Sequence, residues 1–197
     1  GDVAGYFTIA HPSGEDCQAN IYKWAEAAKT AATNSGIDIN SYNRLTFIVA
    51  GLTNCAWSGF SEMGANSQTR TWIFSPYDFV LYHEFGHALG LGHASTYNCG
   101  NKAIDLPANC SQLEYGDPID PMGSGLHHFS SANKFKLNDI PANGVLTLPG
   151  DRFVGGTYTI SRQENNAYDA YYPRVLKIAK TDTNEEYVLE YRQLVGF

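Results

Sequence analysis

One stretch of eleven residues carries side chains that could bind a metal ion and activate water. Residues 83 to 93 read HEFGHALGLGH. On a helix, His83 and His87 lie one above the other on the same face, so both imidazoles can reach one ion at about 2.0–2.1 Å. Three neutral nitrogens with one open position describe a catalytic zinc site, because structural zinc sites are closed. The spacing therefore predicts a single zinc ion held by His83, His87 and His93.

Two other residues of this stretch have different predicted roles. Glu84 is displaced around the helix from the two histidines, so we expect it to act on water as a general base and not as a metal ligand. Gly90 allows the positive-φ conformation that ends a helix, so His93 can approach the ion from a loop. The alternative is a histidine-rich helix end without metal. Five fixed positions fall in register by chance with a probability on the order of 10⁻⁵, which favours the metal site.

The residues before the motif predict a helix from about Pro76 to Leu89. Ser75 is a suitable N-cap, Pro76 fits the first helical position, and Asp78 complements the helix dipole. Upstream, hydrophobic periodicity predicts a helix at 17–33 and strands at 3–10, 45–50, 56–61 and 70–74. Downstream, Ser130 can cap a short helix, and strands are expected at 144–148, 156–160, 174–179 and 186–193.

A second motif follows the third histidine. Residues 115 to 123 read YGDPIDPMG, a turn rich in proline, glycine and aspartate that carries Met122. Taken alone, a methionine in a turn is usually a core residue. Together with the histidine motif, this turn resembles the Met-turn of the metzincin metalloproteases. The resemblance implies that Met122 forms an apolar floor beneath the three imidazoles without binding the metal.

Within the metzincins, the Tyr-Gly-Asp-x-x-x-x-Met-Gly pattern resembles the gametolysin family of secreted endopeptidases. The closing residues EYVLEYRQLVGF are also similar to that family, and the resemblance covers roughly residues 40 to 197. It implies hydrolysis of peptide bonds in extracellular proteins by attack of a zinc-bound water that Glu84 activates. One departure is Ser124, which stands where astacin-like and serralysin-like members have a tyrosine. That additional tyrosine ligand is therefore not expected in this chain.

The resemblance also suggests where substrate binds. The strand at 56–61 would form the upper rim of the cleft, and an extended peptide would pair with its free edge. The residues proposed for this contact are Ala56, Trp57, Ser58 and Gly59. Two histidines after the Met-turn, His127 and His128, are candidates for the wall of the pocket that receives the residue after the scissile bond. Core packing for Trp57, and solvated loop positions for the two histidines, are the alternatives.

The order of the elements predicts an α+β protein. By the resemblance, residues 1–140 form a metzincin-like catalytic domain with a twisted mixed sheet, the zinc-motif helix and the Met-turn below the site. Residues 141–197 change to short strands separated by Gly, Pro, Asn and Asp, which predicts a β-rich extension packed on the catalytic domain. Because the sequence stops directly after a strand, we also expect the natural chain to continue beyond Phe197.

Composition narrows the choice of partners. The net charge is −7, with only 13 lysines and arginines and no basic run, which argues against nucleic acid or an anionic membrane. No apolar run approaches the roughly 18 residues of a membrane-spanning helix. We expect a secreted monomer that acts on protein or peptide substrates. The alternative is a catalytically weak metal-binding adhesin or glycoprotein-recognition module, which would be expected to have lost Glu84.

The four cysteines allow three disulfide pairings, and the sequence does not choose among them. Cys99 and Cys110 bracket a short loop after the third histidine, so proximity favours that pair, and elimination leaves Cys17 with Cys55. Closing the shorter loop would contribute roughly 3 kcal/mol in the chain-entropy model. Four buried free thiols are the alternative. Two bridges would imply an oxidising compartment.

Calcium is a candidate second metal. Four acidic residues after the histidine motif are close enough in sequence to be candidate calcium ligands, although they lack EF-hand spacing: Asp105, Glu114, Asp117 and Asp120. The alternative is that they are solvated loop charges and turn caps.

Overall fold

The computed structural model of the protein describes residues 1–10, 16–50, 55–64, 68–150, 156–164 and 172–193. The chain packs as two compact units, Gly1–Gly92 and His93–Phe197. Both contain helices and small sheets, so the fold is α+β, as predicted. Within the described ranges, every helix is too short or too polar to span a membrane.

The first unit is built on a three-stranded sheet in the order β1–β3–β2. β1 (Arg44–Ile48) runs parallel to the central strand β3 (Thr69–Ile73), and β2 (Gly59–Ser61) runs antiparallel to it. Among the described strands, β2 pairs only with β3, so it lies at the edge of the sheet. This is the edge position that the resemblance implied.

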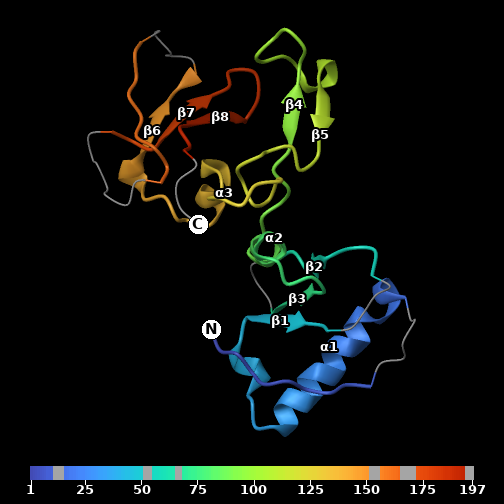
Figure 1. Ribbon diagram of the computed structural model, residues 1–197. Helices are drawn as coiled ribbons and strands as arrows, with labels where there is room; N and C mark the ends of the chain where they lie inside the picture. Colours follow the sequence, from blue (N-terminus) through green and yellow to red (C-terminus); the bar gives the residue numbers. More distant parts are fainter. Residues whose placement is uncertain (11–15, 51–54, 65–67, 151–155, 165–171, 194–197) are drawn as a thin grey trace. The chain divides into compact units, whose positions relative to one another are not determined.

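Two helices cover opposite sides of this sheet (Figure 1). The fully buried Trp72 of β3 faces α1 (Cys17–Asn34), and its indole N–H donates to the carbonyl of Ile21 at 3.0 Å. The next residue, Ile73, faces the other way and lines a pocket with residues of α2 (Asp78–Ala88). The alternation of side chains along a strand thus gives the sheet two buried faces.

α1 forms where the sequence predicts it. Asp16 is its N-cap, and the Asp16 carboxylate accepts a hydrogen bond from the N–H of Gln18. Residues at helical spacing build the core of the unit against β3: Cys17, Ile21, Trp24 and Ala25. The Cys17–Cys55 disulfide joins the start of the helix to the segment before β2. A short 3-10 helix, η1 (Ile39–Ser41), precedes β1.

The second unit begins with a hairpin of β4 (Thr96–Asn98) and β5 (Ser111–Leu113). Its loop contains η2 (Pro107–Asn109) and is closed by the Cys99–Cys110 disulfide. All four cysteines are therefore paired, in the arrangement that proximity and elimination favour. Two disulfides are consistent with an oxidising compartment.

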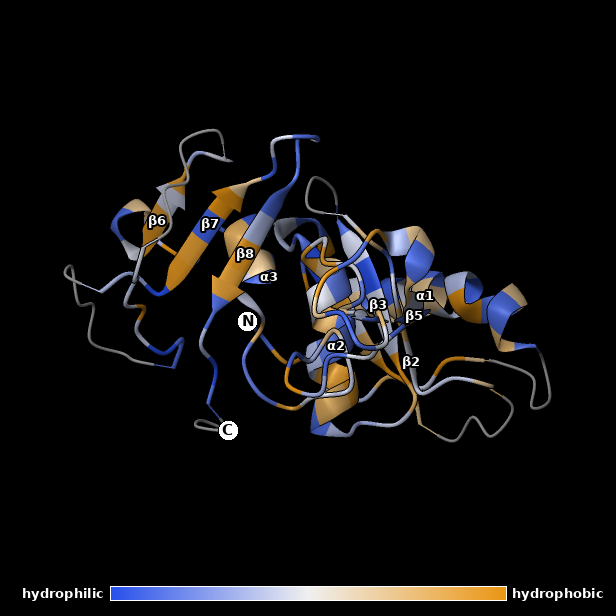
Figure 2. Ribbon diagram, turned by 90° about the horizontal axis from the view of Figure 1, so that it is seen from above, coloured by the Kyte–Doolittle hydropathy of each residue, from blue (hydrophilic) through white to orange (hydrophobic). Residues whose placement is uncertain are grey.

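The remainder of the second unit is a short helix and a three-stranded sheet. The N-cap of α3 (Ser131–Lys136) is Ser130, as predicted, and η3 (Ala142–Gly144) follows. β6 (Val145–Leu148) runs parallel to β7 (Val175–Ala179), and β8 (Glu186–Glu190) runs antiparallel to it. The central strand β7 is apolar along most of its length (Figure 2). That residues 141–197 form a separate extension stays a prediction.

Two predicted strands are absent. Residues 3–10 and 156–160 are described but form no strand, and Val3 and Tyr6 are fully exposed. Strand-like composition is insufficient for a strand, because the backbone N–H and C=O groups also need a neighbouring strand as partner. Conversely, the β4–β5 hairpin was not predicted. Its strands are three residues long and exposed on both faces, so they carry no periodic apolar signal.

Candidate active site

The helix that carries the first two histidines begins later than predicted. α2 starts at Asp78, and Tyr77 occupies the N-cap without a side-chain hydrogen bond. The predicted cap, Ser75, is used differently, because its N–H and that of Phe74 both donate to the carbonyl of Ser58, at 3.0 and 2.9 Å. These bonds hold the chain beside β2 at the point where the helix was expected to begin. The prediction of Asp78 in the first turn is confirmed.

The helix ends as the glycine predicts. Gly90 has φ of 89°, its N–H donates to the carbonyl of His87 at 2.8 Å, and the N–H of Leu91 donates to the carbonyl of Gly86 at 2.9 Å. This pair of bonds is a Schellman motif, in which a left-handed residue reverses the chain. Leu91 is fully buried beyond it. The turn sends the chain away from the helix axis directly before the third histidine.

His83 and His87 lie together on one side of α2. Their ring centroids are 4.7 Å apart, with an angle of 88° between the rings. The Nδ1 atom of His87 is 2.8 Å from the carbonyl oxygen of Leu91. An Nδ1–H that donates to this carbonyl leaves the lone pair of Nε2 for a metal. The carbonyl of Leu91, which the Schellman turn places here, therefore orients the ring of His87.

The third histidine completes a group that could hold a metal ion. Ligand atoms of His83, His87 and His93 all lie within 4.8 Å of one another. The Nδ1 atom of His93 is 2.6 Å from Oε1 of Glu114, and the ring of Tyr115 is 4.0 Å from the imidazole, centroid to centroid. Three imidazoles, two of them with an oxygen acceptor at Nδ1, are a donor set that suits zinc.

The structure gives calcium no support. Across the described ranges, the three histidines are the only group of His, Cys, Asp or Glu side chains with metal-binding proximity. The acidic candidates instead bond to protein groups: Asp105 to Lys102, Glu114 to His93, Asp117 to Arg192, and Asp120 to the N–H groups of Met122 and Ser130. The alternative interpretation, loop charges and turn caps, describes their environment better.

Glu84 is a buried carboxylate on the same helix. Its residue is only 7% exposed, and this burial raises the pKa of the Glu84 carboxyl to about 7. The edge strand lies directly against it, because a Cβ atom on Gly59 would be 2.6 Å from Cγ of Glu84 and 2.9 Å from Oε1. Only a residue without a side chain permits this approach. The sequence analysis proposed Gly59 for substrate contact. Its contact with Glu84 could not be predicted from the sequence, because the two residues are 25 positions apart.

The other residues proposed for substrate contact differ in exposure. Trp57 packs on Phe60 and Phe74, with ring centroids 5.6 and 4.9 Å apart, so it belongs to the margin of the core. Ala56 and Ser58 are exposed beside β2. Two histidines, His127 and His128, are half-buried after the Met-turn. Substrate binding by all of these residues stays a proposal.

The Met-turn is tied to the residue that follows His93. Met122 is fully buried, and its carbonyl accepts a hydrogen bond from the N–H of Ala94 at 2.8 Å. The carbonyl of Ala94 accepts in turn from the N–H of Asp117 at 3.1 Å. A Cβ atom on Gly123 would overlap the carbonyl oxygen of Asp117, so this position requires glycine. Backbone hydrogen bonds thus hold Ala94, the residue after His93, against the turn.

Two aspartates of the Met-turn stabilise it through hydrogen bonds and an ion pair. The fully buried Asp120 accepts hydrogen bonds from the N–H of Met122 at 2.7 Å and from the N–H of Ser130 at 2.6 Å. Asp117 makes a bidentate ion pair with Arg192, at 3.1 and 2.8 Å. Arg192 follows β8, so the closing segment of the chain stabilises a turn about seventy residues earlier. The sequence had assigned Arg192 no role.

We expect the Arg192–Asp117 pair to make stability depend on acid pH. Burial alone would raise the pKa of Asp117, but hydrogen bonds from Arg192 and from backbone N–H groups offset it and hold that pKa below its ordinary value. The stabilisation is therefore present above the unfolded pKa of about 3.9 and is lost as the pH falls through the lower folded value. Arg192→Met, which also removes the 3.0 Å pair with Glu190, should cost about 2–4 kcal/mol at pH 7 and less at pH 3, which is below the unfolded pKa.

Urea unfolding of the parent and the variant at both pH values measures this difference. Arg162→Met is the matched control, because Arg162 is exposed and bonds only to a neutral amide oxygen, that of Gln193, among its described contacts. The control should change stability by less than about 1 kcal/mol at either pH. An equal loss for Arg192→Met at pH 7 and pH 3 would show that the ionised pair is not the cause.

Comparison with known proteins identifies the family. The α+β fold, with a histidine group that could bind a metal ion, is compatible with a metzincin-like peptidase domain. The model of the gametolysin peptidase M11 family matches residues 4–165, which is most of the chain. The chain belongs to this peptidase family, as the resemblance of its motifs implied. No curated protein and no solved structure matches it.

Proposed function

We propose that the protein is a secreted zinc endopeptidase that cleaves peptide bonds in extracellular proteins. The observation that carries this proposal is the placement of the buried Glu84 on the same helix as His83 and His87, in a chain of a peptidase family. A binding module would have no need for a desolvated carboxylate at this position. The two disulfides support secretion, because such bonds persist in oxidising compartments.

The three imidazoles of His83, His87 and His93 would hold the zinc ion. When bound, zinc lowers the pKa of a water ligand from 15.7 to about 7 and polarises the scissile carbonyl. Glu84 would accept the water proton on its carboxylate and pass it to the leaving amine.

The edge of β2 supports the proposed mode of substrate binding. An edge strand offers backbone N–H and C=O groups to an extended peptide, which adds itself to the sheet as a further strand. Gly59 begins this strand and lies against Glu84. A peptide paired with β2 would therefore pass close to the proposed general base.

Digestion of an unfolded protein substrate tests the proposal. We expect cleavage at internal sites, identified by mass spectrometry, together with loss of activity on chelation and recovery when one equivalent of zinc is returned. Cleavage at chain termini only would contradict an endopeptidase. Stoichiometric zinc without any hydrolysis would instead favour the alternative, a metal-binding adhesin or glycoprotein-recognition module.

A further inference from the structure

The third histidine differs from the other two in how it is held. His93 lies in a loop, and its side chain is 26% exposed. Helical backbone fixes His83 and His87, whereas His93 depends on groups that contact it from the β4–β5 hairpin side of its own unit. Oε1 of Glu114 is 2.6 Å from its Nδ1 atom, and the Tyr115 ring packs on the imidazole.

We propose that Glu114 is a positioning residue for the metal centre. Its carboxylate accepts a hydrogen bond from Nδ1–H of His93, which selects one tautomer and leaves the lone pair of Nε2 for the ion. A charge-assisted hydrogen bond of this kind is stronger than a neutral one. It also makes Nε2 more basic, and therefore a stronger ligand for the metal ion. The inference rests on the proposed function, because it assumes that His93 binds zinc.

The β4–β5 hairpin holds the exposed carboxylate of Glu114 beside Nδ1 of His93. The side chain of Glu114 is 65% exposed, so burial does not hold it in place. Pairing of Thr96 with Leu113 in the β4–β5 ladder brings the residues just before β4 opposite those just after β5. Glu114 directly follows β5, and His93 lies three residues before β4, so the two side chains lie near the same open end of the hairpin and meet at 2.6 Å. The turn continues through Tyr115, which has a positive φ of 59°.

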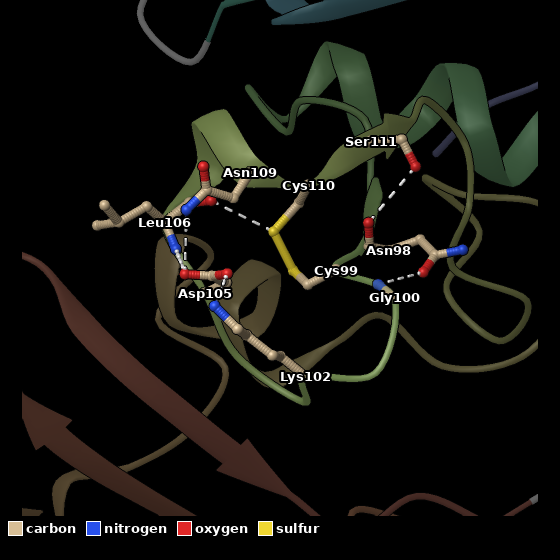
Figure 3. The surroundings of a disulfide bond; sticks show 9 residues. All are labelled: Asn98, Cys99, Gly100, Lys102, Asp105, Leu106, Asn109, Cys110 and Ser111. Carbon is tan, nitrogen blue, oxygen red and sulfur yellow. Dashed lines mark hydrogen bonds and ion pairs between the residues drawn. A yellow bond between two sulfur atoms is a disulfide. The ribbon is translucent and has the colours of Figure 1, made fainter.

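The far end of the hairpin is closed covalently. Cys99 and Cys110 join the two strands, with 4.2 Å between their Cα atoms. Figure 3 shows the loop beyond the disulfide, where the Asp105 carboxylate accepts hydrogen bonds from Lys102 and from the N–H of Leu106, at 2.6 and 2.9 Å. A loop closed in this way has few conformations, so it keeps the strand pair in register. We infer that the disulfide supports the metal centre through Glu114.

Zinc affinity, measured by competition with a chelator, tests the role of Glu114. Glu114→Ala should weaken zinc binding about 10- to 100-fold. Glu114→Asp should weaken it similarly, because the shorter side chain keeps the charge but not the contact. Glu185→Gln is the charge-matched control, since Glu185 is an exposed carboxylate after β7, and it should stay within about twofold of the parent. A Glu114→Asp variant with parental affinity would show that charge alone acts, and would overturn the positioning role.

The tautomer of His93 is an independent readout that a merely structural role would not change. In the metal-free parent, ¹⁵N NMR should show the proton of the His93 ring on Nδ1, and in Glu114→Ala a mixture of both tautomers. An unchanged tautomer together with unchanged zinc affinity would refute the inference. If the parent itself bound no zinc, the proposed function would fail first, so the two failures are distinguishable.

A double-variant cycle tests the contribution of the disulfide. Replacing Cys99 and Cys110 together by serine should weaken zinc binding in the same direction as Glu114→Ala. Adding Glu114→Ala to that protein should then cost much less than it costs in the parent, because the carboxylate is already displaced. Fully additive losses would mean that the disulfide does not act through Glu114.

Discussion

Glu84→Gln is expected to lower kcat by about 10²–10⁴-fold while the variant keeps its fold and its zinc. Glutamine has nearly the shape of glutamate but cannot accept the proton from water. Peptide hydrolysis assays and metal analysis on the same preparations measure the two properties. Near-normal activity would refute the role of general base. A folded but zinc-free variant would show that Glu84 is a metal ligand.

The same variant has an expected effect on stability in the metal-free state. Burial raises the pKa of Glu84 from 4.5 to about 7, so the folded state holds its proton more strongly than the unfolded state does. Stability should therefore fall as the pH rises from about 4.5 to 7, by up to roughly 3 kcal/mol. Glu84→Gln should remove this dependence, which urea unfolding at several pH values can measure.

Gly59→Ala moves the carboxylate without removing it. The new Cβ atom would lie 2.6 Å from Cγ of Glu84 and 2.7 Å from Cγ1 of Val80, so the α2 side chains beneath β2, including the glutamate, must shift. We expect kcat to fall by about 10-fold or more, with KM and zinc content close to the parental values. Gly64→Ala is the matched control, because its Cβ atom would meet nothing closer than 3.8 Å. Equal activity of both variants would contradict the packing argument.

Removal of one of the three histidines should have a large effect on zinc affinity. His93→Ala is expected to weaken zinc binding by more than about 10²-fold, which is beyond the usual cost of losing a group that only orients a ligand. Metal analysis after dialysis against a weak chelator measures it. His83→Ala and His87→Ala should behave alike, and His128→Ala should keep one zinc per chain. Full retention of zinc by all three ligand variants would exclude this site.

Local sequence carried much of the information about the candidate site. The histidine spacing, the glycine at position 90 and the cap at Ser130 describe geometry within a few residues, and such geometry follows from backbone preferences and side-chain chemistry alone. The structure agrees with them: Gly90 has a positive φ, and the three histidines come together. The catalytic role of Glu84 stays a proposal that both the pattern and its burial support.

The sequence-based predictions of secondary structure were wrong where a segment depended on hydrogen-bond partners far away in the chain. Ser75 has the chemistry of an N-cap, but the carbonyl of Ser58 takes its N–H and that of Phe74, so the helix begins at Asp78. The segments at 3–10 and 156–160 have strand-like composition but pair with no strand among the described residues, and they are irregular. In each case, hydrogen-bond partners elsewhere in the chain decided the outcome.

By itself, the sequence determined which histidines could bind a metal and which carboxylate we propose to act on water, since residue type and helical spacing are local properties. Only the tertiary structure decided what surrounds them. Gly59 reaches Glu84, Glu114 reaches His93, and Arg192 reaches Asp117 across about 20 to 75 residues of chain. Strand pairing and close packing create these contacts, and neither leaves a periodic signal at the residues concerned.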